Sequence, residues 1–155
     1  MTGVRIAYNE SDTLGGGMFA HLTTVDMTDV RIEVNKAGTL GGGMYLVGGT
    51  ADMTDVRIDL NSADFGGGMF LIEGTANMTK GSIYRNNTKT AGGGVYIYEH
   101  ARFTLEGGSI LSNNAEAGGG VYINRGTLVM EDGQISTNHA TQGGGVFVGN
   151  LAHLL

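Results

Sequence analysis

A run of three glycines recurs along the chain at a nearly fixed interval, and this period constrains the fold more than any other feature. The runs begin at Gly15, Gly41, Gly66, Gly92, Gly118 and Gly143. The intervals between them are 26, 25, 26, 26 and 25 residues. A period of about 20 to 50 residues is typical of proteins built from stacked supersecondary units. We therefore expect a single solenoid domain over residues 1–155.

Three columns of other residues share this period. An apolar residue, usually methionine, follows the glycines at Met27, Met53, Met78, Leu105 and Met130. Isoleucine comes five residues later, at Ile32, Ile58, Ile83, Ile110 and Ile135, with Ile6 before the first run. Asparagine comes three residues after each isoleucine, at Asn9, Asn35, Asn61, Asn86, Asn113 and Asn138. We predict that the apolar columns face the core, where methionine fills irregular gaps, and that the asparagine amides form a hydrogen-bonded ladder at a corner.

Each repeat contains three short runs with the alternating pattern of a half-buried strand. Examples are "GGGVYI", "TADMT" and "DVRID". The segment between the asparagine and the next glycine run is expected to form a corner between strands. The glycines are expected at the corner before the first strand, where they allow positive φ and close stacking of backbones. Helical repeats need about 33 to 47 residues per unit. The sequence therefore predicts an all-β, right-handed parallel β-helix of about six turns with three strands per turn.

The composition argues against several classes of protein. The chain has no cysteine, so it contains neither disulfides nor thiolate metal sites. Its net charge of −6 disfavours binding to a nucleic-acid backbone. No apolar run approaches the length of a membrane span, and "MTGVRIAYNESD" lacks the pattern of a signal peptide. We therefore expect no cofactor, no nucleic-acid partner and no membrane insertion.

An aromatic residue follows the methionine or valine that comes after each glycine run. The six residues are Phe19, Tyr45, Phe70, Tyr96, Tyr122 and Phe147. Period two places them on the outside of the coil if the preceding residue faces inward. An exposed ladder of six rings would stack on sugar rings or dock a partner. The alternative is that the rings stack only on one another and stiffen the sheet.

Two copies of the motif "DMTD" supply weak candidates for a calcium site, at Asp26, Asp29, Asp52 and Asp55. Ca²⁺ binds about six to eight oxygens, and paired carboxylates also serve glycoside hydrolysis. The motif repeats with the fold, however, which favours ion pairs on a solvated face. We expect the arginine column Arg5, Arg31 and Arg57 to be neutralised by Asp29, Glu33, Asp55 and Asp59. No metal site is predicted, because the histidines fall in different columns, at His21, His100, His139 and His153.

Threonines form one further column, at Thr24, Thr50, Thr75 and Thr127. An ice-binding solenoid needs a flat, regular array of short hydroxyl residues on one face. Arg102 interrupts this column, and we expect no second unbroken threonine column beside it.

The strings "GGGM" and "GGGV", with "IEVN", "IYRN", "ILSN" and "ISTN", resemble repeats of bacterial right-handed β-helix surface proteins. The chlamydial polymorphic outer membrane proteins and autotransporter passengers are of this type. The likeness covers nearly the whole chain. It implies an exported passenger or adhesin segment, secreted or at the cell surface, with a glycan or host-cell-surface partner. Repeat columns encode stacking, so they specify a fold better than a function.

The favoured function is a non-enzymatic structural or binding segment of an extracellular, adhesin-like β-helix protein. Two alternatives stay open: a carbohydrate-binding or carbohydrate-cleaving β-helix, and an ice-binding solenoid. The ends of an uncapped solenoid expose unpaired backbone groups and apolar side chains together. We therefore expect end-to-end self-association or continuation into a longer β-helix.

Overall fold

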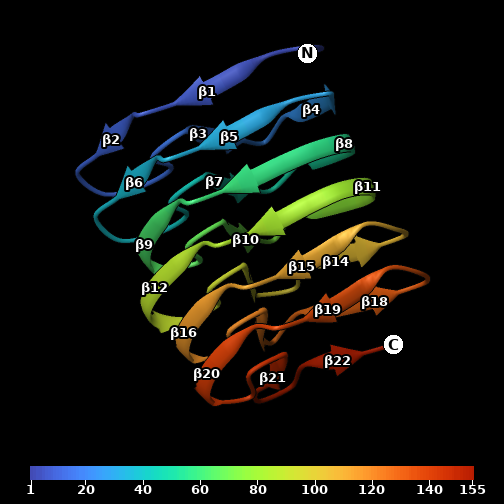
Figure 1. Cartoon of the computed structure of the whole chain (residues 1–155). Coiled ribbons are helices and arrows are strands. Elements are labelled where there is room, and N and C mark those ends of the chain that lie inside the picture. Colours follow the sequence, from blue (N-terminus) through green and yellow to red (C-terminus); the bar gives the residue numbers. More distant parts are fainter.

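The computed structural model describes residues 1–155, and all of its regular elements are β-strands. The chain winds as a right-handed coil of parallel strands, in which each turn lies directly beside the next (Figure 1). The coil has about six turns with three strands per turn, so the predicted fold is confirmed.

Successive turns build three parallel sheets that run along the coil. Sheet I contains β3 (Met18–His21), β7 (Met44–Val47), β10 (Met69–Ile72), β13 (Val95–Tyr98), β17 (Val121–Asn124) and β21 (Val146–Val148). Sheet II contains β1 (Arg5–Ala7), β4 (Thr24–Thr28), β5 (Arg31–Glu33), β8 (Thr50–Asp59), β11 (Thr75–Tyr84), β14 (Arg102–Leu105), β15 (Ser109–Leu111), β18 (Thr127–Met130), β19 (Gln134–Ser136) and β22 (His153–Leu154). Sheet III contains β2 (Glu10–Ser11), β6 (Lys36–Ala37), β9 (Ser62–Phe65), β12 (Asn87–Ala91), β16 (Asn114–Ala117) and β20 (His139–Gln142).

The division of a turn into strands differs from the expected one. The second and third predicted runs share sheet II, and in β8 and β11 they join into single strands of ten residues. The segment after the asparagine, expected as a corner, forms sheet III instead. Its inward residues are small, such as Ala37, Ala63 and Ala115, so it lacks the strong apolar alternation of a buried strand.

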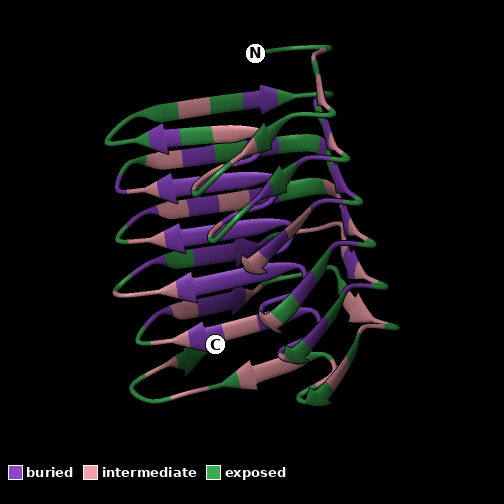
Figure 2. Ribbon diagram, turned by 90° about the vertical axis from the view of Figure 1, so that its left-hand side faces the viewer, coloured by how far each residue is buried: buried purple, intermediate pink, exposed green.

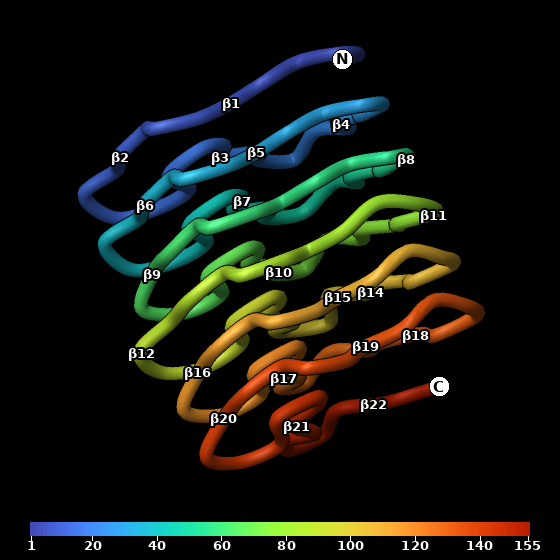
Figure 3. Tube along the Cα trace, viewed as in Figure 1, coloured from blue at the N-terminus to red at the C-terminus, as the bar shows by residue number.

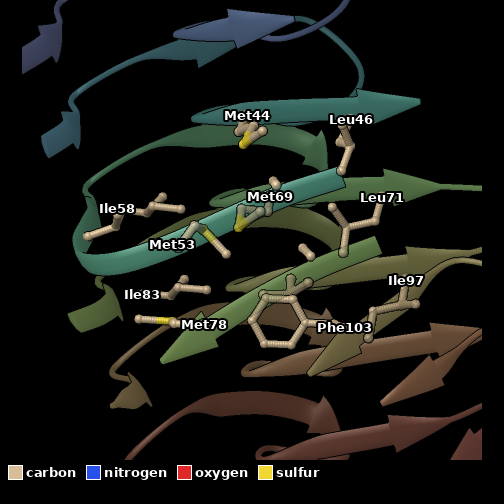
Figure 4. Close-up of a cluster of buried hydrophobic side chains, with 14 of the residues drawn as sticks. Met44, Leu46, Met53, Ile58, Met69, Leu71, Met78, Ile83, Ile97 and Phe103 are labelled. Carbon is tan, nitrogen blue, oxygen red and sulfur yellow. The ribbon is translucent and has the colours of Figure 1, made fainter. Parts of the chain in front are cut away.

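Equivalent residues of successive turns lie opposite one another, which stacks the apolar columns inside the coil. Met69, for example, pairs with Met44 on one side and with Val95 on the other. Figure 4 shows the inward methionines, leucines and isoleucines of sheets I and II packing against one another. Phe103 is fully buried and replaces the alanine that occupies the same column at Ala76. The core is therefore a continuous apolar rod that runs along the coil.

In the first five runs, the three glycines are needed for different reasons. The first has positive φ, for example 66° at Gly41 and 63° at Gly66, a conformation that suits glycine best. A Cβ on the second, Gly67, would lie 2.6 Å from the carbonyl oxygen of Asn87 and 2.7 Å from that of Gly93. A Cβ on the third, Gly68, would lie 2.5 Å from the carbonyl oxygen of Gly94. The run thus combines one backbone requirement with two close approaches between turns.

The predicted asparagine ladder is confirmed. Asn86 donates from its backbone N and from Nδ2 to Oδ1 of Asn113, at 2.9 and 3.0 Å. Its Nδ2 also donates to the carbonyl oxygen of Ile58 at 2.9 Å. The same pattern joins all six asparagines from Asn9 to Asn138. The ladder satisfies polar groups at a tight corner, where the preceding residue, such as Arg85, has a positive φ of 52°.

The turns at the two ends are less buried than those in the middle. Figure 2 shows purple concentrated in the middle turns, with green and pink at both ends. No residue from 130 to 155 is buried, and among residues 1–19 only Gly16 is buried. The N-terminus lies at one edge of sheet II and the C-terminus at the opposite edge, both on the same side of the coil (Figure 3).

Candidate binding face

The outer surface of sheet I carries the aromatic column predicted from the sequence. Met44 and Leu46 of β7 point into the core, so Tyr45 between them points outward. Parallel register then places the equivalent residues side by side, with Tyr45 opposite Phe70 and Phe70 opposite Tyr96. The column is therefore a ladder of rings along the outside of the coil.

Three of the five neighbouring ring pairs of the ladder are stacked, and the other two are tilted, by 40° for Tyr45 and Phe70 and by 32° for Tyr96 and Tyr122. Ring centroids lie 5.4 Å apart for Phe19 and Tyr45, 4.7 Å for Phe70 and Tyr96, and 4.8 Å for Tyr122 and Phe147. The interplanar angles of these three pairs are 10°, 18° and 4°. Such offset stacking is favourable beyond the burial of area alone. The stacking predicted as one of the two interpretations is present.

The expectation of an exposed ladder is wrong for its middle rungs. Tyr45, Phe70 and Tyr96 are 8%, 5% and 8% exposed, whereas Phe19 at the end is 52% exposed. Side chains of two flanking columns pack against the rings and cover them. One flanking column precedes the glycines, at Leu14, Leu40, Phe65, Ala91, Ala117 and Gln142. The other lies two residues after the ladder, at His21, Val47, Ile72, Tyr98 and Asn124.

These three columns together form the surface that we call the aromatic face. Sequence reasoning missed its two flanking columns, although period two and the residue before each glycine run identify them in hindsight. Phe65 packs edge-on against Tyr96 at a centroid distance of 5.9 Å, and Tyr98 does the same from the other side at 6.1 Å. Leu40, Phe65, Phe70, Tyr96 and Tyr98 line an apolar hollow of about 240 Å³ on this face.

The aromatic face is apolar but contains hydroxyl groups. His21 is its one titratable group apart from the tyrosines, so the face carries no fixed charge. Burial raises the pKa of Tyr45, and it raises the pKa of Tyr96 despite an opposing hydrogen bond from Asn124. Both phenols therefore stay protonated around neutral pH and can donate hydrogen bonds. The face combines flat apolar rings with a few neutral donors.

The acidic candidates are not gathered into one site. Asp26 lies opposite Asp52 in sheet II, and Oδ1 of Asp52 accepts a hydrogen bond of 2.7 Å from Asn77. Asp55 faces Lys80, with Nζ and Oδ2 3.4 Å apart. No three histidine or acidic side chains converge in a geometry that could hold a metal ion. The weak calcium candidates Asp26, Asp29, Asp52 and Asp55 are thus distributed along the sheet.

The arginine column is neutralised only in part as expected. Arg5 pairs with Glu33 at 2.5 Å, and Arg57 pairs with Asp59 at 2.7 Å. Arg31, between them in register, has no carboxylate within 4.0 Å. Asp59 also binds Arg85, at 2.9 Å, and Arg85 lies outside the predicted column. The expectation is confirmed for Arg5 and Arg57 and is wrong for Arg31. Glu33 and Asp59 bind other arginines, Asp55 binds Lys80, and Asp29 makes no ion pair.

The extra residue of the fourth turn opens a second hollow. Glu99 and His100 both have positive φ there, at 40° and 60°. The hollow measures about 490 Å³ and is lined by Glu99, His100, Arg125, Thr127, Leu151 and His153. Arg125 hydrogen-bonds Glu99 at 2.8 Å and lowers the pKa of that carboxyl. A carboxyl held ionised in this way is unsuited to act as a general acid in glycoside cleavage.

Threonine hydroxyls lie in two columns on the outer face of sheet II. Thr24 and Thr50 belong to the predicted column, and Thr28 and Thr54 belong to another on the same outer face of sheet II, with Asp26 and Asp52 between the two. Thr2 and Thr79 extend the second column through a bridge to Thr28 and a 3.1 Å contact with Thr54. A register shift after Met78 interrupts the second column, and Asp26 and Asp52 separate it from the first, so it is not an unbroken threonine column beside the first.

Comparison with protein-family models, curated proteins and solved structures finds no significant match to this chain. The structure contains no helix with the length and apolar character needed to cross a bilayer.

Proposed function

We propose that this chain is a non-enzymatic structural and binding segment of an adhesin-like β-helix protein at the cell surface. In this proposal the coil is a stiff support, and the aromatic face of sheet I binds a neutral glycan chain. The observation that carries the proposal is the composition of that face, which combines stacked rings, one apolar hollow and tyrosine hydroxyls without fixed charge.

A glycan fits these chemical features better than a charged or purely apolar ligand. A pyranose ring whose substituents are equatorial presents C–H groups on its flat faces and hydroxyls around its edge. The C–H faces can pack on the half-buried rings of Phe65 and Tyr98, which line the hollow, while hydroxyls at the edge meet the phenols of Tyr96 and Tyr98. Exposed apolar patches of this kind commonly mark ligand or protein contact sites.

The support that the coil gives is also favourable for binding. The face lies on one rigid sheet whose strands are held in register by the core and by the asparagine ladder. A ligand that stacks along it loses little free energy to rearrangement of the protein, because the rings already occupy fixed positions.

The experiment is a glycan-binding screen with the intact chain, followed by titration of cello- and chito-oligosaccharides. The test variant is the double substitution Phe65→Ser and Tyr98→Ser, which removes both walls of the 240 Å³ hollow. The matched control is Tyr84→Ser, since Tyr84 lies in sheet II and contacts Arg85 instead. We expect at least a tenfold loss of affinity in the double variant and none in the control. Equal binding by both variants, or no glycan bound at all, would contradict the proposal.

The paired threonine columns support a second candidate, an ice-binding surface on sheet II. Thr24, Thr28, Thr50 and Thr54 place four hydroxyls in register on the outer face of sheet II, on either side of Asp26 and Asp52. Measurement of thermal hysteresis tests this candidate directly. The candidate requires hysteresis that Thr54→Tyr reduces, whereas a freezing curve like that of an inert protein excludes it.

A further inference from the structure

The corner between sheets I and II departs from the repeat in the fourth turn. That turn has one extra residue there, and Glu99 and His100 both have positive φ, at 40° and 60°. No other two consecutive non-glycine residues of the chain share this conformation. Strained backbone of this kind is common at functional sites, and insertions in solenoids often lie on the binding face. The corner therefore has a local feature that stacking of the turns does not require.

The hollow at this corner has the size and the polarity of a small-molecule site. Its volume of about 490 Å³ lies within the range of about 300–1,000 Å³ that is usual for ligand pockets. Five of its six lining side chains carry polar groups, and Leu151 is the exception. We call it the polar hollow, because the 240 Å³ hollow on the aromatic face is lined only by apolar and aromatic side chains.

Glu99 and Arg125 hold an acceptor and a set of donors in a fixed arrangement within the polar hollow. Nη1 of Arg125 donates to Oε1 of Glu99 at 2.8 Å, and this bond lowers the pKa of the carboxyl. The side chains of Glu99 and Arg125 are 23% and 52% exposed, so a ligand can reach both. A guanidinium has five N–H donors and a carboxylate has about four acceptor sites. Most of these donors and acceptors are therefore left for a ligand.

The fixed charges around the polar hollow cancel. Glu73 lies beside Glu99, since its backbone N donates to the carbonyl oxygen of Glu99 at 3.0 Å. Arg102 lies opposite Thr127 in sheet II and has no carboxylate within 4.0 Å. Apart from the two histidines, the corner thus has two acids and two arginines. A neutral ligand fits this balance better than an anion or a cation.

Two neighbouring hydroxyls on a sugar ring match the donors and acceptors of the polar hollow. A sugar hydroxyl can donate to the carboxylate of Glu99 while its oxygen accepts from the guanidinium of Arg125. Hydrogen bonds to ionised groups are stronger than those between neutral groups. Thr127 and His100 add a hydroxyl and an imidazole as further partners. The hollow therefore recognises the hydroxyl edge of a sugar, which complements the stacking offered by the aromatic face.

Tyr98 connects the polar hollow with the aromatic face. Its ring lines the 240 Å³ hollow on that face, and the next residue, Glu99, lines the polar hollow. A hydrogen bond from the Tyr98 phenol also contributes to the lowered pKa of Glu99. A chain of sugars seated on the aromatic face thus meets the polar hollow where it passes the corner.

We propose that the polar hollow is a second sugar subsite, in which Glu99 and Arg125 bind neighbouring hydroxyls of a neutral glycan whose adjoining units pack on the aromatic face. This inference rests on the proposed function for the class of ligand, and it adds a subsite of different chemistry. The two hollows act together only on a ligand long enough to reach both, so the affinity depends on the number of sugar units.

Calorimetric titration with cello- and chito-oligosaccharides of increasing length measures this dependence. For the wild type we expect the affinity to rise by about tenfold or more once the ligand reaches both hollows. Arg125→Met preserves much of the side-chain length and removes the donors, so it should lose this rise while short oligosaccharides still bind the aromatic face. Arg31→Met is the matched control in sheet II, away from both hollows, and should keep the rise. Circular dichroism and thermal melts check that both variants are folded.

Histidine signals locate the contact independently of affinity. His100 and His153 line the polar hollow, whereas His139 lies in sheet III. In an NMR titration of ring-labelled histidine with the longest oligosaccharide, we expect saturable shift changes at His100 and His153. No change is expected at His139.

The possible outcomes separate this subsite from the proposed function. Shift changes limited to the tyrosines of the aromatic face, with Arg125→Met binding like the wild type, would overturn the subsite and leave the proposed function intact. Binding that Arg125→Met abolishes but the double variant Phe65→Ser and Tyr98→Ser retains would support the subsite and contradict binding on the aromatic face. Displacement of the oligosaccharide from His100 by inorganic sulfate would indicate an anion site and overturn the subsite, and a wild type that binds no oligosaccharide would overturn both proposals.

Discussion

Asn61 donates a hydrogen bond from Nδ2 to Oδ1 of Asn86 in the next turn, over 3.0 Å. The second hydrogen of the same amide goes to the carbonyl oxygen of Ile32 in the previous turn, over 2.9 Å. One buried side chain thus links three turns of the coil. The ladder is the polar counterpart of the apolar core, because it satisfies the backbone at a corner that faces no water.

Replacement of Asn61 by alanine should destabilise the chain by about 1–3 kcal/mol, because it leaves buried partners in both adjacent turns without hydrogen bonds. The free energy of unfolding from denaturant melts measures the effect. Asn114→Ala is the matched control, since Asn114 makes its 2.9 Å bond to Asn87 at an exposed position. A loss of a few tenths of a kcal/mol for Asn61→Ala, similar to the control, would show that the ladder contributes little.

The glycine runs predict a contrast between the middle and the end of the coil. Gly67→Ala forces a methyl group against two backbone carbonyls and should cost about 3 kcal/mol or more, since the backbone cannot move away without breaking the stack. Gly144→Ala in the last turn should lower the thermal midpoint only slightly. Thermal melts of the two variants in dilute solution make the comparison, and equal destabilisation would argue against close stacking of the turns.

The ion pairs of sheet II should differ in strength according to burial. The side chain of Asp59 is 3% exposed and binds both Arg57 and Arg85. Asp59→Asn should therefore cost about 2 kcal/mol, whereas Glu10→Gln should have much less effect, because water screens its exposed pair with Lys36. Denaturant melts at low and high salt measure both. A double-mutant cycle of Arg57 and Asp59 that gives no coupling energy would contradict this interpretation.

The core should be most sensitive at Phe103, which is its largest fully buried side chain. Its neighbours in the column are Ala76 and Leu128, and small residues cannot fill the space that the ring leaves. Phe103→Ala should therefore cost about 3–5 kcal/mol. Phe19→Ala, at a half-exposed end of the aromatic ladder, is the control and should cost much less. Similar losses of unfolding free energy for the two variants would show that packing of Phe103 contributes little to the stability of the core.

The sequence predicts the fold well because each position of a solenoid turn requires the same type of residue in every turn. The glycine, isoleucine and asparagine columns each have a strong local requirement, so their period is visible without any alignment. Sheet III is missed because its inward positions hold alanine or threonine, such as Ala63 and Thr88, which carry no apolar signal. The continuity of β8 is also missed, because Asp55 has a positive φ that interrupts the alternating pattern without ending the strand.

The candidate site is predicted only in outline. The six rings are evident from their period, but their burial depends on flanking residues that vary from turn to turn. Phe65 and Tyr98 create a hollow because their neighbours in the same columns are smaller or shaped differently, and no repeat rule specifies this. The hollow near Glu99 depends on a one-residue insertion and on the pairing of His153 with Thr127, which only the three-dimensional register establishes.

The central claim is that the aromatic face of sheet I is the binding surface, and the tyrosines themselves provide the most direct test. Tyr45, Tyr96, Tyr98 and Tyr122 lie on that face, whereas Tyr8 and Tyr84 lie elsewhere and contact arginines. The measurement is an NMR titration of ring-labelled tyrosine with cello- and chito-oligosaccharides. We predict saturable shift changes confined to the four tyrosines of the face. Changes confined to Tyr8 and Tyr84, or no change with either oligosaccharide, would contradict the claim.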